Sequence, residues 1–146
     1  MGPLLVGYDG RDASQKALEH AINEAKLRGT TIVVLVVGGL RYENVNPYDP
    51  GTIDVGLIEP VPKEGPLEIQ PAMREARTTL AESGVEGSVE WSIGDPVSEI
   101  LDAAERLEAS AIVIGSHKHS AIGRFLGADT AEEIIRDARC DVLVAR

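Results

Sequence analysis

The sequence predicts an α/β fold with a five-stranded parallel sheet, doubly wound, and helices on both faces. Short aliphatic runs alternate with segments of helical periodicity about five times along the chain, the order typical of parallel sheets with right-handed crossovers. Several of these runs lack polar alternation, which indicates strands covered on both faces. Aromatic residues make up only 3% of the chain against 43% hydrophobic, so the core is aliphatic. At 146 residues, we expect a single domain over 1–146.

The first part of the chain reads as strand, helix, strand. The run Leu4–Val6 predicts a buried strand that stops at Gly7. A capping box from Asp12 to Gln15, with Asp12 as N-cap, is expected to open a helix that ends at Gly29. The continuous apolar run 31–37 predicts a second strand, buried on both faces.

Residues 40–66 hold five prolines and three glycines and show no periodicity. They predict a long loop, which is either functional or a tolerated surface excursion.

A helix is expected over 67–83, with Ala72, Met73, Ala76 and Leu80 inward and Gly84 as its stop. The alternating segment 88–93 predicts a half-exposed or edge strand. Asp95 then has the position of an N-cap and Pro96 that of a first helical residue, for a helix running to Leu107.

The last part of the chain repeats the alternation. The run 111–114 predicts a buried strand closed by Gly115, and 116–128 a loop. A second capping box, Thr130 to Glu133, is expected to open a helix with Ile134, Ile135 and Ala138 inward. The run 141–144 predicts the final strand.

Charge and cysteine content narrow the partners and the compartment. The net charge of −10 disfavours nucleic acids and anionic membranes as partners. The single cysteine, Cys140, excludes an intramolecular disulfide and zinc-finger spacing, and it fits a reducing compartment. The N-terminus lacks the pattern of a signal peptide, and no apolar run approaches the ~20 residues of a membrane helix. We therefore expect a cytoplasmic location.

The loop that follows the strand 111–114 is basic in an acidic chain. It carries Lys118, Arg124 and two histidines, no acid, three glycines and two serines. It leads into a helix N-terminus, where free N–H groups and the positive dipole end favour a phosphate. The alternative is a glycine-rich turn with incidental basic residues. The spacing matches neither a Walker motif nor the dinucleotide fingerprint.

Four motifs together resemble the universal stress protein family. They are Val6-Gly7-Tyr8-Asp9-Gly10, Gly94-Asp95-Pro96, Gly115-Ser116-His117 through Gly127, and Cys140-Asp141-Val142-Leu143-Val144. The resemblance runs nearly end to end and implies a Rossmann-like five-stranded sheet of the adenine nucleotide alpha hydrolase type.

One branch of this family binds ATP through a signature of Gly-x-x-Gly, nine residues, then Gly-Ser/Thr. Here Gly115 and Gly127 match, Lys118 replaces the second glycine at a spacing of eight residues, and Ala128 replaces the hydroxyl residue. The side chain of Lys118 either obstructs a phosphate or ligates it. Asp129 at the helix start either repels a phosphate or holds Mg²⁺ beside it.

The resemblance also implies roles for other residues. Gly7, Tyr8 and Asp9 resemble the contacts to adenine and ribose, with Asp9 accepting from a ribose hydroxyl or, alternatively, capping a turn. The backbone of Val37 would read adenine, Ile114 would pack near the base, and both also suit the core. The phosphate side of the predicted site is completed by His117 as a donor, Thr130, and Ser116 and Arg124 in support. No metal ligand and no catalytic residue is predicted.

These features favour a universal stress protein that binds an adenine nucleotide (ATP or AMP, or a cyclic nucleotide) and acts as a dimeric stress-response or signalling module. The strand Val142-Leu143-Val144 resembles the edge through which the family pairs; the alternative is a monomer. A rival function is a nucleotide-free member acting through an unknown protein partner. A slow ATPase, or self-phosphorylation on Ser116, Ser120 or Thr130, is a third; no nucleophile elbow is present.

Overall fold

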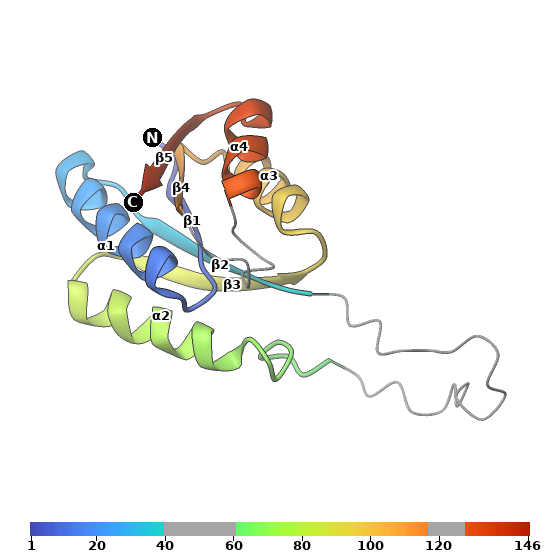
Figure 1. Cartoon of the computed structure of the whole chain (residues 1–146). Helices are drawn as coiled ribbons and strands as arrows, with labels where there is room; N and C mark the ends of the chain where they lie inside the picture. The colour runs from blue at the N-terminus through green and yellow to red at the C-terminus, as the bar shows by residue number, and fades with distance from the viewer. Residues whose placement is uncertain (40–60, 117–127) are drawn as a thin grey trace, which may run out of the picture.

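The computed structural model describes residues 1–39, 61–116 and 128–146. Nine elements follow one another in this part of the chain: β1 (Leu4–Gly7), α1 (Asp12–Arg28), β2 (Ile32–Gly38), α2 (Gln70–Ser83), β3 (Gly87–Ile93), α3 (Pro96–Arg106), β4 (Ala111–Gly115), α4 (Ala128–Asp137) and β5 (Asp141–Ala145). The strands form one parallel sheet in the order β3-β2-β1-β4-β5 (Figure 1). The predicted five-stranded parallel α/β fold is confirmed.

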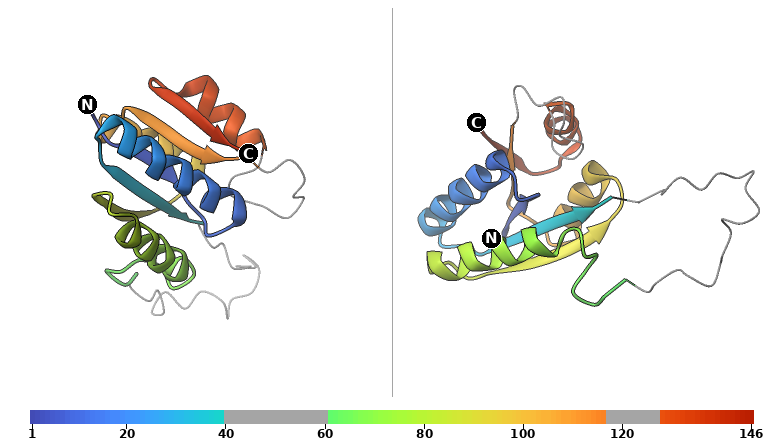
Figure 2. Two further views of the ribbon diagram at one scale, coloured as in Figure 1. Left: turned by 90° about the vertical axis from the view of Figure 1, so that its left-hand side faces the viewer. Right: turned by 60° about the horizontal axis from the view of Figure 1, so that its bottom comes forward.

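Helices cover both faces of the sheet, as predicted. Helices α1 and α2 lie on one face and α3 and α4 on the other (Figure 2). Successive residues of a strand point to opposite faces, so Leu4 and Val6 join a core with α1 and α2, whereas Leu5 joins a core with α3 and α4. Each of these three side chains is 0% exposed. Burial of one such aliphatic side chain stabilises the fold by about 1.5–3 kcal/mol, which makes the central strands the main source of stability.

Most helix ends follow the sequence signals. The Asp95 carboxylate accepts hydrogen bonds from the backbone N–H of Ser98 at 3.1 Å and from its Oγ at 3.0 Å, with Pro96 at the first turn of α3. Gly29 and Gly84 adopt left-handed φ values of 67° and 74° after α1 and α2, a conformation that glycine reaches without a steric penalty.

The predicted capping box at Asp12 is wrong. Asp12 already lies in the first turn of α1, and the side-chain amide of Gln15 donates to the carbonyl of Gly10 at 3.0 Å instead of reaching back to residue 12. Asp9 organises the turn: its Oδ1 accepts from the Arg11 N–H at 2.9 Å and from Ser14 Oγ at 2.8 Å. The helix therefore begins immediately after this turn.

Three further expectations shift. Helix α4 begins at Ala128, so Thr130 lies inside its first turn and not at an N-cap. Ile135, expected inward, is 54% exposed, because the buried face of α4 follows Ala131 and Ile134 and the next position points about 100° away. Helix α2 begins at Gln70 rather than 67, and Leu67 is exposed.

The end of the predicted 40–66 loop is anchored on the edge strand β3. Gly65, with φ 96°, packs so closely that a Cβ there would lie 3.1 Å from the Trp91 ring. The indole N–H of Trp91 donates to the carbonyl of Lys63 at 3.3 Å. Residues 40–60 of that loop lie outside the described residues. Over the three described stretches, the helices are each too short or too polar to cross a membrane.

The end of α3 generates a stability prediction. Glu108 is the one residue other than glycine with a positive φ (49°) in the described part of the chain, and this conformation lets the Ala109 N–H bond the Ala104 carbonyl at 2.9 Å. A side chain there is strained. Glu108→Gly is expected to raise the free energy of unfolding by about 0.5–1 kcal/mol in urea denaturation. Glu108→Ala, which removes the charge but keeps the Cβ, is the control; a Gly variant no more stable than the Ala variant would contradict the strain.

Candidate functional site at the carboxyl edge of the sheet

The strand order reverses between β1 and β4. From β1 the chain proceeds outward through β2 to β3, and from β4 it proceeds the other way to β5. At such a switch point the loops leaving the two central strands diverge, and ligands of parallel α/β folds bind there. Because β1 and β4 are parallel neighbours, their carboxyl ends lie at the same edge of the sheet (Figure 1).

The loop after β1 offers a carboxylate in a fixed position. Oδ1 of Asp9 is held by Arg11 and Ser14, and the Asp9 N–H donates to Ser14 Oγ at 3.2 Å. Ser14 is 1% exposed, so this network is rigid. No described residue donates to Oδ2. Asp9 therefore fills the turn-capping role considered from sequence and retains an acceptor for a ligand.

Gly7 allows the sheet edge to close against α3. A Cβ on Gly7 would lie 3.0 Å from Ile100 Cδ1 and 3.4 Å from Ile114 Cγ2. Ile114 is fully buried in the core beneath α3 and α4. Gly7 and Ile114, both predicted for the site, are thus brought together by packing.

The side chain of Tyr8 turns to the opposite face. It is 3% exposed within the core of α1 and α2, and its hydroxyl donates to Glu75 Oε1 at 2.6 Å. Burial, reinforced by the Glu75 hydrogen bond and charge, raises the pKa of Tyr8 well above its usual range. The phenol is therefore a neutral donor, and only the backbone of Tyr8 remains for a ligand at the edge.

A small hollow marks the site, with a volume of about 10 Å³, room for about one water. Four of its lining residues were predicted for the site: Gly7, Tyr8, Asp9 and Val37. The other three are Leu35, Pro96 and Ile100, which the sequence analysis assigned only to the core or to a helix start. The signal for the added residues was available, since Gly94-Asp95-Pro96 also follows a strand at this edge.

Val37 has free backbone groups on the β1 side. The register of β1 with β2 ends at Gly7 opposite Leu35, and the Tyr8 N–H donates to the Leu35 carbonyl at 3.0 Å. Because alternate residues of a strand face the same neighbour, the N–H and C=O of Val37 point to the same side as those of Leu35, beyond the end of β1. Among the described residues, these two groups have no strand partner on that side.

Gly115 and Ser116 have structural roles at the end of β4. A Cβ on Gly115 would lie 2.2 Å from the carbonyl oxygen of Ala13, so only glycine lets α1 approach the strand. The Ser116 N–H donates to the Ala145 carbonyl of β5 at 2.8 Å. Close packing alone therefore accounts for the glycine.

The rest of the predicted phosphate loop lies outside the described residues: His117, Lys118, Arg124 and Gly127. The loop ends where α4 begins, with Ala128, Asp129 and Thr130 in its first turn. Helix α4 leads from the end of β4 back to the start of β5 (Figure 1), so its N-terminus faces the same edge as Asp9. Among the described residues no group of three or more His, Cys, Asp or Glu could hold a metal ion.

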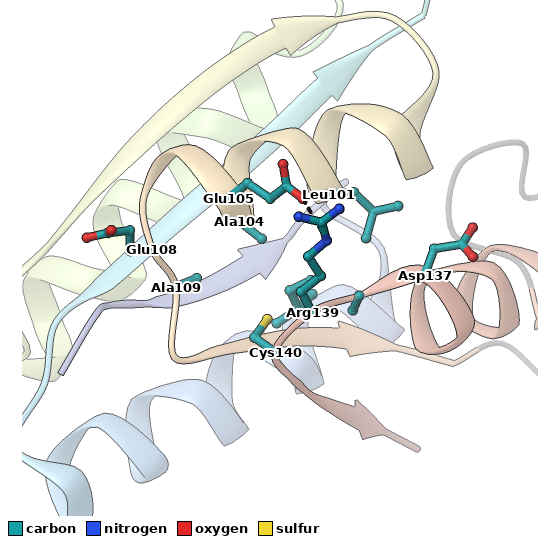
Figure 3. A pocket seen from close by; sticks show the side chains of 10 residues that line it. Leu101, Ala104, Glu105, Glu108, Ala109, Asp137, Arg139 and Cys140 are labelled. Atoms are coloured by element: carbon teal, nitrogen blue, oxygen red, sulfur yellow. Dashed lines mark ion pairs between the residues drawn. The ribbon is translucent and has the colours of Figure 1, made fainter.

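A second hollow, of about 180 Å³, lies between α3 and the start of β5 (Figure 3). Its floor is apolar, and its rim carries the carboxylates Glu105, Glu108 and Asp137 with Arg139, which pairs with Glu105 at 3.4 Å. Cys140 lines it, and burial raises the pKa of that thiol. The acidic rim disfavours an anion in this hollow.

A family model described as "universal stress protein family" matches residues 1–146. The chain belongs to the universal stress protein family. A universal stress protein of Methanocaldococcus jannaschii is 31% identical over 98% of this chain and 81% of its own length.

Solved structures of other family members share the fold. The universal stress protein of Archaeoglobus fulgidus has a TM-score of 0.70 at 26% identity, over 100% of this chain and 99% of that one. A second structure of an Archaeoglobus fulgidus universal stress protein is a complex with dAMP, with a TM-score of 0.65 at 26% identity, over 100% and 98%. The family and fold predicted from the four motifs are confirmed.

The packing at Gly115 generates a prediction for the ligand-free protein. Gly115→Ala forces the Cβ into the Ala13 carbonyl and is expected to lower the free energy of unfolding by about 3 kcal/mol. Gly29→Ala is the matched control, because a Cβ there meets nothing within 4 Å and only its left-handed φ costs about 1 kcal/mol. Equal costs in urea denaturation would contradict the close approach of α1.

Proposed function

We propose that this universal stress protein binds an adenine nucleotide at the carboxyl edge between β1 and β4. The carrying observation is the juxtaposition, around one hollow, of Asp9 with a free carboxylate oxygen and Val37 with free backbone groups. Asp9 Oδ2 accepts from a ribose hydroxyl. The Val37 N–H and C=O, one donor and one acceptor, match the hydrogen-bonding edge of adenine.

Similarity supports the same ligand class. The Archaeoglobus fulgidus protein that was solved with dAMP is 26% identical over the whole of this chain. A nucleoside monophosphate also suits this sequence better than a triphosphate, because alanine stands at 128 where the family signature has a hydroxyl residue, and residue 129 at the start of α4 is an aspartate, which disfavours further negative charge at a helix N-terminus. We propose AMP, or a cyclic nucleotide, as the preferred ligand, with ATP bound more weakly or with Mg²⁺ at Asp129.

The size of the hollow bears on how the ligand enters. A volume of about 10 Å³ does not hold an adenine, whereas small-molecule sites measure about 300–1,000 Å³. Binding therefore requires the edge to open, with the basic loop 115–129 supplying the phosphate contacts. The same observation favours the second candidate, a nucleotide-free member that acts through a protein partner, and the titration below decides between them.

We further propose a homodimer through β5, acting as a cytoplasmic stress-response or signalling module. β5 is an edge strand paired only with β4. The Ala145 carbonyl accepts from the Ser116 N–H, so the backbone of Ala145, and by alternation that of Leu143, faces β4. The backbone groups of the intervening residues Val142 and Val144 therefore face outward. An unpaired apolar edge of this kind is a template for a second strand.

Asp9→Asn tests the nucleotide site. Asparagine retains an Oδ1 acceptor for Arg11 and Ser14 but loses the charged oxygen, so the affinity for AMP is expected to fall about tenfold in calorimetric titration. Removal of a negative charge would by itself strengthen the binding of a phosphate ligand. A fall in AMP affinity therefore indicates loss of the hydrogen bond to Asp9, whereas a rise indicates loss of charge repulsion. Asp12→Asn, an equal charge change at an exposed position of α1, is the control.

If the wild-type protein binds AMP and the Asp9→Asn variant binds it with the same affinity, the proposed ribose contact is contradicted. Wild-type protein that binds none of AMP, cyclic AMP and ATP at millimolar concentration, with or without Mg²⁺, would contradict the proposed function and favour the nucleotide-free member.

Val144→Pro tests the dimer. Proline removes the outward N–H of β5, and the mass measured by light scattering is expected to fall from dimer to monomer. Val144→Thr keeps that N–H and a similar shape and is expected to remain dimeric. Circular dichroism checks that both variants are folded. A monomeric wild-type protein, or a folded proline variant that stays dimeric, would contradict pairing through β5.

A further inference from the structure

Glu75 of α2 receives two short hydrogen bonds from the two sides of the β1–α1 loop. Its Oε1 accepts from the Tyr8 hydroxyl at 2.6 Å and from the Gln15 side-chain amide at 2.7 Å. Bonds to an ionised carboxylate at such distances are among the stronger ones in proteins. Tyr8 precedes Asp9 directly, and Gln15 lies in the first turns of α1, so one oxygen joins the entry and the exit of the loop.

The loop itself is tied to the same cluster. The Gln15 amide also donates to the Gly10 carbonyl at 3.0 Å. Gly10 has a φ of 84°, and a Cβ there would be 3.4 Å from the Cβ of Ala72 in α2. Tyr8 is therefore bonded to Glu75 of α2, and Gly10 to Gln15 of α1. Asp9 is bonded through its Oδ1 to Ser14, also in α1.

The Tyr8 ring makes this anchor stiff. The side chain is 3% exposed in the core beneath α1 and α2, so its hydroxyl group has little freedom to move. The hydrogen bond to Glu75 therefore holds the carboxylate in one position relative to Tyr8. Tyr8 is also linked to β2, through its N–H and the Leu35 carbonyl. A displacement of α2 at Glu75 is thus passed to the backbone that presents Asp9.

We propose that Glu75 is a positioning residue for the nucleotide site: it sets the affinity for AMP by fixing the Tyr8–Gly10 backbone, without touching the ligand. This inference rests on the proposed nucleotide binding and adds α2, which contributes no residue to the hollow lining, to the machinery of the site. Preorganisation of this kind raises affinity because less ordering remains for the binding step.

The loss of charge and the loss of the anchor predict opposite changes in AMP affinity. Removal of the Glu75 carboxylate takes a negative charge from the neighbourhood of an anionic ligand, which by Coulomb's law would strengthen binding. Loss of the anchor weakens it. Glu75→Ala is therefore expected to weaken AMP binding about three- to tenfold in calorimetric titration, as the loss of one or two such hydrogen bonds predicts.

Three companion variants separate positioning from charge and from general destabilisation. Glu75→Gln keeps an oxygen acceptor for both donors and is expected to bind within about twofold of wild type. Tyr8→Phe removes one donor without changing charge and is expected to weaken binding about threefold. Glu82→Ala, at an exposed position on the same helix, matches the charge change and is expected to leave the affinity unchanged. AMP affinity in Glu75→Ala equal to or tighter than wild type, or equal loss in Glu75→Ala and Glu75→Gln, would overturn the proposal.

A measurement without nucleotide separates this inference from the proposed function. Amide hydrogen exchange reports local opening, and the hydrogen-bonded amides of Asp9 and Arg11 are expected to exchange at least threefold faster in Glu75→Ala than in wild type and Glu82→Ala. Unchanged exchange at these amides would overturn the anchor even if AMP binds. If wild-type protein binds no nucleotide, the function fails, and the positioning of an AMP site by Glu75 fails with it, whatever the exchange rates.

Discussion

The burial of β1 governs the geometry of the site. Leu4, Leu5 and Val6 are each 0% exposed, packed between β2 and β4 at their edges and between two helical layers at their faces. A strand enclosed in this way cannot shift its register without exposing apolar side chains. The residues that follow it are therefore fixed in space, and Asp9 is the first carboxylate after β1 at the switch point.

Glycine and tight packing carry that constraint outward. Gly7 allows Ile100 and Ile114 to close under the edge, and Gly115 allows α1 to approach β4. Both glycines belong to motifs that resemble nucleotide-binding signatures, yet packing explains each of them fully. The proposed ligand contacts are instead the Oδ2 oxygen of Asp9 and the backbone of Val37, and the proposed role of Glu75 is to position Asp9 from a neighbouring helix. The net charge of −10 opposes an anionic ligand mainly through the acidic groups close to the site, since charges more than about 8 Å away are largely screened at physiological ionic strength.

The sequence predicted the layers of this fold because hydrophobic periodicity reports which side of an element is buried. The N-cap at Asp95 and the stops at Gly29 and Gly84 follow from equally local signals. The start of α1 did not, because Asp9 and Asp12 have equivalent capping chemistry and only the turn geometry chooses between them. The Ile135 expectation was wrong because the apolar pattern does not say how wide the buried face is; in α4 that face follows Ala131 and Ile134, and Ile135 lies at its edge, 54% exposed.

Long-range contacts were beyond sequence reasoning. The Tyr8 hydroxyl and Glu75 are 67 residues apart in the chain, and nothing in either local pattern indicates that they meet. The orientation of Tyr8 away from the edge likewise depends on the layer beneath α2. Motif resemblance predicted a site at Gly7, Asp9 and Val37, but it did not indicate that the Tyr8 side chain points into the core while only its backbone lines the hollow.

The most direct test of the account is a map of backbone amide chemical shifts of the isotope-labelled protein during titration with AMP. The account predicts saturable shifts centred on Asp9, Val37 and Ser116, at the carboxyl ends of β1, β2 and β4. Shifts centred on the hollow around Leu101 and Cys140, or no shifts at millimolar AMP, would contradict it.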